Sequence, residues 1–391
     1  MTPKAIELHK AGGKRCPEID LRKVSRELTD WDQQTLMTIT ASVLTPEQVQ
    51  RILSPELRFP RQRHVLAVHW HPEQVPMDLA SARIAAMFPG RRDELIIPTQ
   101  HNQLLALGEY AGVEVDCYSR GFNRKVQILL HMRAERLPQA GVLANMLRHT
   151  FTYRSSQLFE YLDYLCDQKC EDSRQRAADK AGSDEEVVAF AAIQAEKLKA
   201  LLDKNATAVA EDAIKNKLVR NYLDALREFY DDHFINKVQV YVKAVKEEVK
   251  DNFSLGYFYR TSEVIEEARA VGAGVVIPHP EQFWPILLAE YDIDGIEVWN
   301  PQSRQYTEFL INVVNRLNKD GLRHGRKQLV FMGDDCHLSE KLKSPKEQDP
   351  EKAVREVGLQ PAWDDLAISK SLIVAGVDRK TVMDEYRARL A

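Results

Sequence analysis

Four short apolar runs in this chain each end in residue types that bind metal ions, and this shared pattern constrains the fold more than any other feature. The runs cover residues 65–71, 112–115, 275–280 and 330–337. Each has the β-branched and apolar composition of a short buried strand. A strand that ends in His, Glu or Asp places that side chain at the rim of a sheet or barrel. The sequence therefore predicts several strand ends that meet at one metal site.

Helical patterns alternate with the predicted strands. Helices are predicted over residues 78–87, 104–112, 262–271 and 306–318, and a further strand over residues 94–98. Strand–helix alternation predicts a parallel sheet or a barrel. In such folds the reacting groups gather at the carboxyl ends of the strands, where the metal-binding residue types already lie.

The middle of the chain has a different character. Between about residues 142 and 252, proline and strand patterns are almost absent, and apolar residues such as Ala189, Ile193 and Leu198 recur at helical spacing. We predict a helical extension, a barrel in two parts, a helical insertion between these parts, and a helical tail that packs on the outside. The boundaries are, in that order, residues 1–60, 61–140 with 254–340, 141–253, and 341–391.

The composition argues against several functions. The net charge is −4 and no broad basic field is present, which argues against sequence-independent binding to duplex nucleic acid. No run of about 18 apolar residues occurs, so we expect no membrane span. Residues 1–15 lack the apolar core of a secretory signal. The odd, scattered cysteines indicate reduced thiols in a cytoplasmic protein. They are Cys16, Cys117, Cys166, Cys170 and Cys336.

Two pairs of candidate ligands have a spacing of two residues. His69 and His71 follow one strand, and Asp335 and His337 follow another. In extended backbone, residues i and i+2 project to the same side, so each pair can bind one ion. Cys336 lies within the second pair, and the same geometry turns its side chain the other way.

Three further candidate ligands stand singly. Glu114 lies inside an apolar strand, where an unpaired carboxylate costs several kcal/mol and a cation would satisfy it. His279 follows a strand between two prolines that stiffen the turn. His101 follows the strand over residues 94–98. Nitrogen and oxygen ligands without thiolates suit Zn²⁺, Mn²⁺ or Fe²⁺.

An ordered set of motifs extends these single observations. In chain order, the motifs are residues 69–71, 98–102, 111–115, 272–280, 295–298 and 333–337. Together they resemble the PHP (polymerase and histidinol phosphatase) domain, over roughly residues 61–132 and 255–338. That family is a distorted seven-stranded barrel that holds two or three metal ions and cleaves phosphoesters. The resemblance implies an α/β chain with a distorted (β/α)7 barrel, an N-terminal helical extension and a long helical insertion.

The resemblance also implies a set of metal ligands. They are His69, His71, His101, Glu114, His131, His279, Asp335 and His337. Glu114 would bridge two ions, of which one would also be held by His69, His71 and Asp335. His279 would belong to the second ion. We expect two or three divalent ions, and the ligand chemistry suits zinc, manganese or iron.

The remaining implied roles concern catalysis. His131 would complete the second ion, while His101 and His337 would bind a third ion or act as acid–base residues. Asp335 or His337 would help to move the proton when a metal-activated hydroxide attacks phosphorus. Arginines near strand ends suit phosphate, because the planar guanidinium matches two phosphate oxygens. The candidates are Arg120, Arg260 and Arg304.

The chain differs from the family pattern at three places. Gln100 stands where an Asp precedes the His of the second motif, and Gln127 stands where the next strand often carries a His. After His71, only Asp78 or Glu73 lies where the family has a further ligand. These differences affect the ligands that would bind a third ion and the ligand set of the second ion.

Three functions fit these residues. The first is a metal-dependent phosphoesterase that cleaves a small phosphorylated metabolite or nucleotide. The second is a metal-dependent hydrolase of another bond, of the amidohydrolase kind, although no lysine at a strand end is placed to bridge metals. The third is a catalytically weak metal-binding scaffold whose helical insertion binds a partner. A homo-oligomer formed through that insertion would also fit.

Overall fold

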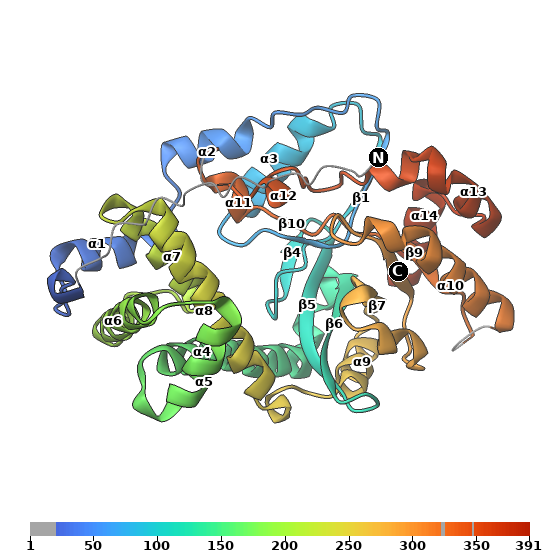
Figure 1. The fold of residues 1–391 in the computed structure, drawn as a ribbon. Coiled ribbons are helices and arrows are strands. Elements are labelled where there is room, and N and C mark those ends of the chain that lie inside the picture. The colour runs from blue at the N-terminus through green and yellow to red at the C-terminus, as the bar shows by residue number, and fades with distance from the viewer. Residues whose placement is uncertain (1–20, 322–324, 346–347) are drawn as a thin grey trace, which may run out of the picture. The chain divides into compact units, whose positions relative to one another are not determined.

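The computed structural model describes residues 21–321, 325–345 and 348–391. Predictions for residues 1–20, including Cys16, lie outside these ranges. The described chain forms two compact units (Figure 1). The helical unit comprises the described residues up to Ala41 together with Arg154–Phe253, and the α/β unit comprises Ser42–Tyr153 and Ser254–Ala391. Within the described ranges, no helix combines the length and apolar character needed to span a membrane.

The strands of the α/β unit form three small hydrogen-bonded sheets (Figure 1). β1 pairs with β3, β10 pairs with β2, and the largest sheet has the order β4-β5-β6-β7-β8-β9. The pairs β4–β5, β5–β6 and β6–β7 are antiparallel, and the others are parallel. The strands are β1 (His64–Ala67), β2 (Trp70–His71), β3 (Asp93–Ile96), β4 (Leu105–Leu107), β5 (Tyr110–Ser119), β6 (Arg124–Arg133), β7 (Gly274–Ile277), β8 (Gly295–Trp299), β9 (Leu329–Met332) and β10 (Cys336–His337).

The mixed α/β class is confirmed. The closed (β/α)7 barrel is not, because the strands of the described chain form three separate hydrogen-bonded sheets. Isolated backbone hydrogen bonds lie between the ends of these strands instead. The amide of Glu114 donates to the carbonyl of Gln100 over 3.2 Å, and the amide of Asp335 donates to the carbonyl of His69 over 2.9 Å. Regular pairing stops at these places because Asn102 and Asp335 have φ values of 54° and 45°, which extended strands do not adopt.

The helix predicted over residues 104–112 is wrong, because this segment forms the β4–β5 hairpin. Leu107 pairs with Tyr110 across a two-residue turn. Gly108 begins this turn with φ 59°, a conformation that glycine adopts without steric cost. The apolar residues of this stretch therefore alternate across a sheet instead of lining a helix.

One apolar cluster collects side chains from most of the strands and from the C-terminal helix. Strand residues in this cluster alternate with residues that face the outer helices, because successive side chains of a strand point to opposite faces. The inner residues from the strands and their ends are Leu66, Val68, Leu95, Ile97, Tyr110, Leu129, Val276, Leu329 and Phe331. This shared cluster places the strands around a common interior.

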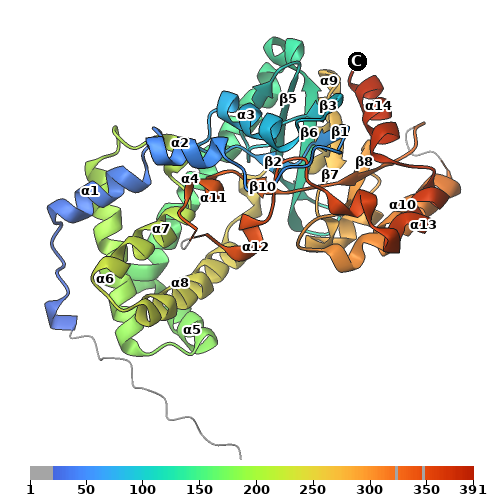
Figure 2. The same cartoon turned by 90° about the horizontal axis from the view of Figure 1, so that it is seen from above.

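Helix α14 (Arg379–Leu390) packs into the same interior cluster. Val382, Met383, Tyr386 and Leu390 are each at most 1% exposed. Figure 2 shows α14 beside the strands, and it contacts β1, β3, β6, β7 and β9. The expectation that the tail packs only on the outside is therefore wrong for this helix.

The other helices of the α/β unit surround the sheets. Apolar residues of α9 and α10, among them Val264 and Leu310, pack against the outward-facing residues of β5 to β9. Helix α2 begins with the capping box of Thr45 and Gln48, which the sequence Thr-Pro-Glu-Gln favours. These helices are α2 (Pro46–Leu53), α3 (Met77–Met87), α9 (Thr261–Ala270), α10 (Thr307–Asp320), α11 (Ser339–Leu342), α12 (Pro350–Ala353) and α13 (Leu366–Ala375).

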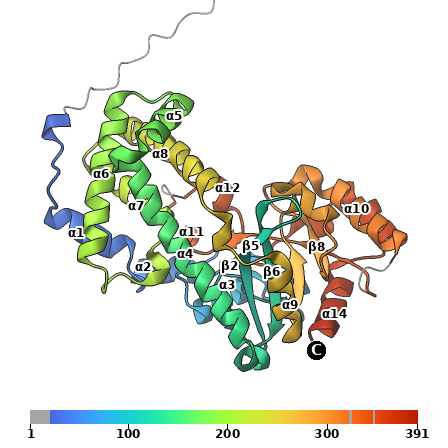
Figure 3. The same cartoon turned by 90° about the horizontal axis from the view of Figure 1, so that it is seen from below.

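The helical unit, whose helices Figure 3 shows, has its own apolar core. A buried ion pair attaches α1 to this core: Lys197 Nζ lies 2.7 Å from Asp32 Oδ2, and the Tyr222 hydroxyl donates to Asp32 Oδ1 over 2.5 Å. These contacts hold the pKa of Asp32 below its usual value, although burial acts in the opposite direction. The helices are α1 (Asp30–Ile39), α4 (Gly141–Cys166), α5 (Glu171–Ala181), α6 (Glu185–Lys204), α7 (Lys217–Ala225) and α8 (Asp232–Asn252), and α4 begins in the α/β unit.

Removal of the helical unit is expected to leave a folded, metal-binding α/β unit. The chain leaves and re-enters this unit at neighbouring points, since the rings of Tyr153 and Tyr257 stack with centroids 4.0 Å apart. A unit with its own core can fold alone. The variant lacks residues 1–41 and 154–253 and joins Tyr153 to Ser254 by a short Gly-Ser linker. Circular dichroism and metal analysis provide the measurement, and an unfolded product would show that the helical unit is needed for folding.

Candidate metal centre

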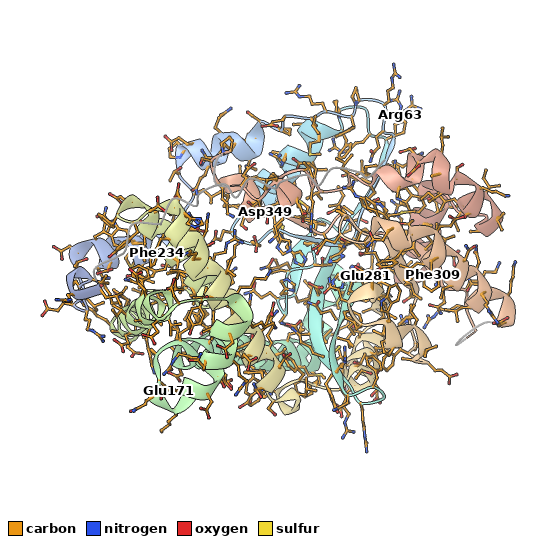
Figure 4. All side chains as sticks on the ribbon, viewed as in Figure 1. Arg63, Glu171, Phe234, Glu281, Phe309 and Asp349 are labelled. Carbon is orange, nitrogen blue, oxygen red and sulfur yellow. The ribbon has the colours of Figure 1, made fainter. Side chains whose placement is uncertain are left out.

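Seven of the eight predicted ligands come together at strand ends of the α/β unit. They are His69 and His71 at β2, His101 after β3, Glu114 in β5, His279 after β7, and Asp335 and His337 at β10. Figure 4 draws the side chains around these strand ends, and its label Glu281 marks the turn that follows His279. These seven residues are candidate ligands, and we call them, for short, the metal centre.

The metal centre contains three overlapping groups whose ligand atoms lie within 4.8 Å of one another. The first group is His69, Glu114 and His279, and the second is His69, His71 and Asp335. Both groups are buried. The third group, His71, His101 and His337, includes two partly exposed imidazoles.

The Glu114 carboxylate presents its two oxygens to different imidazoles. Oε1 lies 3.3 Å from His279 Nε2 and 3.9 Å from His69 Nε2. Oε2 lies 2.5 Å from His101 Nδ1 and 3.6 Å from His71 Nε2. Each oxygen of Glu114 thus faces its own pair of imidazoles.

The Asp335 carboxylate uses only one oxygen toward the imidazoles. Oδ1 lies 3.4 Å from His337 Nε2, 3.6 Å from His71 Nε2 and 3.7 Å from His69 Nε2. The other oxygen, Oδ2, accepts a hydrogen bond from Gln302 Nε2 over 2.7 Å. It also accepts one from Arg355 Nη1 over 2.9 Å.

Glu297 in β8 fixes the orientation of His69. Its Oε2 accepts the Nδ1 hydrogen of His69 over 2.6 Å, which leaves His69 Nε2 directed at Glu114 and Asp335. A carboxylate on the far nitrogen of a ligating histidine is a common support of metal sites. A Cβ atom at Gly333 would lie 2.1 Å from Glu297 Oε2, so the space for this carboxylate depends on that glycine.

His131 is the exception among the predicted ligands. Its Nε2–H donates to the carbonyl of Val68 over 2.8 Å, and its Nδ1 accepts the hydroxyl hydrogen of Tyr386 over 2.7 Å. Burial lowers its pKa to about 3, so the ring is neutral. Both nitrogens are occupied, and His131 therefore supports the interior instead of holding an ion.

The role of the three predicted phosphate partners stays a prediction. Arg120, Arg260 and Arg304 are exposed, and within the described chain they contact none of the seven ligands. Arg260 lies instead 3.8 Å from Glu263 on its own helix. The arginine that does reach a ligand is Arg355, which sequence reasoning missed because it lies in the predicted outer tail.

Two of the three departures from the family pattern lie beside the metal centre. Glu73 Oε1 lies 3.4 Å from His337 Nδ1, whereas Asp78 is exposed on α3. Gln100 Oε1 accepts the backbone amide hydrogen of Glu73 over 3.2 Å. Gln100 thus holds the turn that carries Glu73, and Glu73 is the better candidate for the additional ligand.

Backbone strain concentrates at the metal centre. Five described residues other than glycine have positive φ, and four of them touch or adjoin the ligands. They are Glu73 at 52°, Asn102 at 54°, His279 at 26° and Asp335 at 45°. Such conformations cost about 1–3 kcal/mol each and persist where the surrounding structure imposes them, often at functional sites.

The charges of the two central carboxylates are stabilised by the imidazoles. Burial by itself would raise the pKa of Glu114, but His101, His279 and His71 hold it well below its usual value. The pKa of Asp335 is likewise held well below its usual value, against burial, by His337, His71 and His69. Both groups are therefore anionic ligands at neutral pH.

The pKa values of the imidazoles shift in different directions beside these carboxylates. Burial acts to lower the pKa of His69, but Glu297, Asp335 and Glu114 raise it to about 10. Burial and the neighbouring imidazoles lower the pKa of His71 to about 3. A divalent cation would take over the charge that protonated imidazole supplies, and ligand protons would leave as it binds.

The residues present fit a metal ion. Among the described residues, buried nitrogens of His69, His71 and His279 find no hydrogen-bond partner, and such buried polar atoms are costly unless a ligand satisfies them. All donors are nitrogen or oxygen, because Cys336 Sγ lies 3.4 Å from the carbonyl of Arg355 and away from the ligands. Burial raises the pKa of this thiol well above its usual value. The donor set suits Zn²⁺, Mn²⁺ or Fe²⁺.

Comparisons with known proteins give little beyond this geometry. No protein family and no curated protein matches the chain. One similar solved structure is a protein of Bifidobacterium adolescentis that is provisionally described as a metal-dependent phosphoesterase. The two chains are 15% identical, and the match covers 82% of this chain and 99% of the other with a TM-score of 0.40. This sequence identity and TM-score are too low to support a function, so the functional conclusion depends on the geometry of the site.

Proposed function

We propose that this chain is a metal-dependent phosphoesterase that cleaves a small phosphorylated metabolite or nucleotide at the metal centre. The observation that carries this proposal is the Glu114 carboxylate, whose two oxygens face two different pairs of imidazoles. A shared carboxylate among histidines at strand ends suits a site with two ions. The motif order that resembles the PHP domain favours a phosphoester over other bonds.

Two ligand sets would share the Glu114 carboxylate. His69 and His279 would hold one ion with Glu114, while His71 and Asp335 would hold the next ion with the other carboxylate oxygen. Divalent ions at such a site lower the pKa of a water molecule and stabilise the phosphoryl oxygens. We propose two ions, and His101 and His337 would then either hold a third ion or transfer protons.

Two imidazoles at the mouth of the site are our candidates for proton transfer. The side chains of His101 and His337 are 19% and 25% exposed, whereas those of His69, His71 and Glu114 are at most 1% exposed. A group that protonates a leaving oxygen must reach both substrate and solvent. Asp335 and Glu73 contact the two ring nitrogens of His337 and raise its pKa to about 9, against the effect of burial.

We also propose that the three sheets act as one distorted barrel. The shared interior cluster and the single hydrogen bonds between sheet edges support this arrangement. The irregular backbone at those edges then has a use, since it turns His69, His101 and Asp335 inward at the carboxyl ends of the strands. Functional residues at such ends are typical of barrels.

Metal analysis and a substrate screen test the proposed function. Protein purified without chelator is expected to contain two or more divalent ions per chain and to hydrolyse p-nitrophenyl phosphate when Mn²⁺ is added. Chelator should remove this activity, and Mn²⁺ should restore it. Parallel aryl ester and anilide substrates should react much more slowly. Preference for the anilide would favour an amidohydrolase, and one ion or fewer without turnover would favour a metal-binding scaffold.

A further inference from the structure

A buried segment that follows α12 lies against the metal centre. We call residues 355–360 the strap. Glu356 is held by Arg83 at 2.6 Å and by Lys341 at 2.8 Å. The amide of Gly358 donates to Asp334 Oδ2 over 2.8 Å, and Gln360 Nε2 donates to the carbonyl of Leu66 over 2.7 Å. These contacts fix the strap on both sides of the strands that carry the ligands.

Arg355 of the strap places its guanidinium beside Asp335. Arg355 Nη1 donates to Asp335 Oδ2 over 2.9 Å and to the Asp335 carbonyl over 3.2 Å. The Arg355 side chain is only 5% exposed, so the guanidinium faces the ligand and not the solvent. The bond to the carbonyl also holds the strained backbone at Asp335, whose φ is 45°.

Gln302 acts on the same oxygen from the loop that follows β8. Its Nε2 lies 2.7 Å from Asp335 Oδ2. Two donors therefore occupy Oδ2, while Oδ1 alone faces the imidazoles of His69, His71 and His337. A carboxylate that is bound in this way can offer a metal ion one oxygen but not two.

We propose that Arg355 is a positioning residue that makes Asp335 a one-oxygen metal ligand. This inference rests on the proposed function for its use in catalysis, but its effect on metal binding stands separately. Partners of ligating carboxylates typically change metal affinity or activity by about 10–100-fold when they are removed. Arg355 would act through Asp335, and no contact with substrate is required of it.

Arg83 provides a matched control. It is also buried, with its side chain 5% exposed, and it binds Glu356 in the same strap. It also donates to the carbonyls of Arg51 and Ile52, and in the described part of the chain its hydrogen bonds and ion pairs reach no residue of the metal centre. Loss of Arg83 thus removes a buried guanidinium from the strap without releasing a metal ligand.

The test compares Arg355→Met with Arg83→Met in the full-length chain stripped of metal. Isothermal titration calorimetry with Mn²⁺ is expected to show a Kd for Mn²⁺ that is raised about 10–100-fold in Arg355→Met. In Arg83→Met the Kd should be nearly unchanged. Thermal unfolding should show that both variants are destabilised. Arg355→Lys, which keeps one donor, should recover part of the affinity, and Gln302→Ala, which removes the second donor, should weaken Mn²⁺ binding by a few-fold.

Kinetics of phosphate-ester hydrolysis complete the test. Arg355→Met should lower kcat at saturating Mn²⁺ and leave KM for the substrate nearly unchanged. An unchanged Mn²⁺ Kd in both Arg355→Met and Gln302→Ala would overturn the inference, as would a raised KM with unchanged metal affinity, which would make Arg355 a substrate contact. If Arg355→Met does not fold, the Kd for Mn²⁺ of Gln302→Ala and of Arg355→Lys decides instead, and an unchanged Kd in both would overturn the inference. Absence of hydrolysis in the unsubstituted protein, with the Kd shift present, would remove the phosphoesterase proposal alone.

Discussion

Glu114→Gln is expected to abolish metal-dependent turnover and to reduce the bound metal to one ion or fewer per chain. The amide has nearly the shape of the carboxylate but no negative charge, and its nitrogen cannot ligate an ion. Both oxygens of Glu114 face imidazoles, so one of the two sides must lose its ligand. Two-metal sites contribute several kcal/mol of transition-state stabilisation, which corresponds to a fall in kcat of about three orders of magnitude.

Asp116→Asn is the matched control for this variant. Asp116 is two residues further along β5, on the same face of the strand, and is likewise buried. It is bound by Lys125 at 2.8 Å and by Asn102 at 2.9 Å, outside the three ligand groups. Metal content by mass spectrometry and kcat should change little in this variant. Equal losses in both variants would show that any buried carboxylate of β5 has this effect, and our assignment of Glu114 would fail.

Met383→Asp is expected to prevent folding of the α/β unit. Met383 is fully buried in the interior cluster, together with Val382, Tyr386 and Leu390 of the same helix. Burial of such side chains contributes about 2 kcal/mol each, whereas whole domains are stable by only about 5–15 kcal/mol. An unpaired carboxylate in this cluster adds a further cost. Both terms act against the folded state.

The control for this prediction is Ala388→Asp, which places the same residue on the exposed side of α14. It carries the same change in charge and a similar loss of helix propensity. Thermal unfolding and gel filtration should show Met383→Asp as aggregated or unfolded, and Ala388→Asp as close to the unsubstituted protein. A folded Met383→Asp protein would mean that α14 is outer packing after all.

Local sequence patterns were sufficient to predict where most strands lie and which ligand types follow them. The strand predicted over residues 65–68 agrees with β1, and the strand at 275–277 agrees with β7. The helix predicted over residues 78–87 agrees with α3. These elements are visible because their apolar periodicity is contained within a few residues. The hairpin at Gly108 was missed because its apolar residues are too few to separate helical from strand spacing.

Long-range contacts account for the errors at the candidate site. His131 has the residue type of a ligand and lies in a strand, but Tyr386, 255 residues further along the chain, occupies its Nδ1. Arg355 has no motif around it, and its contact with Asp335 depends on how the strap crosses the sheet edges.

The sequence by itself determined which residue types gather at the metal centre, because candidate ligands and their spacing of two residues can be read within short segments. The tertiary structure alone decided which oxygen faces which imidazole, that His131 is excluded, and that Arg355 joins Asp335. These outcomes depend on packing between segments that are far apart in the chain. A small rotation of a side chain decides whether its polar atom lies within hydrogen-bonding distance of a partner. Local sequence patterns do not predict such rotations.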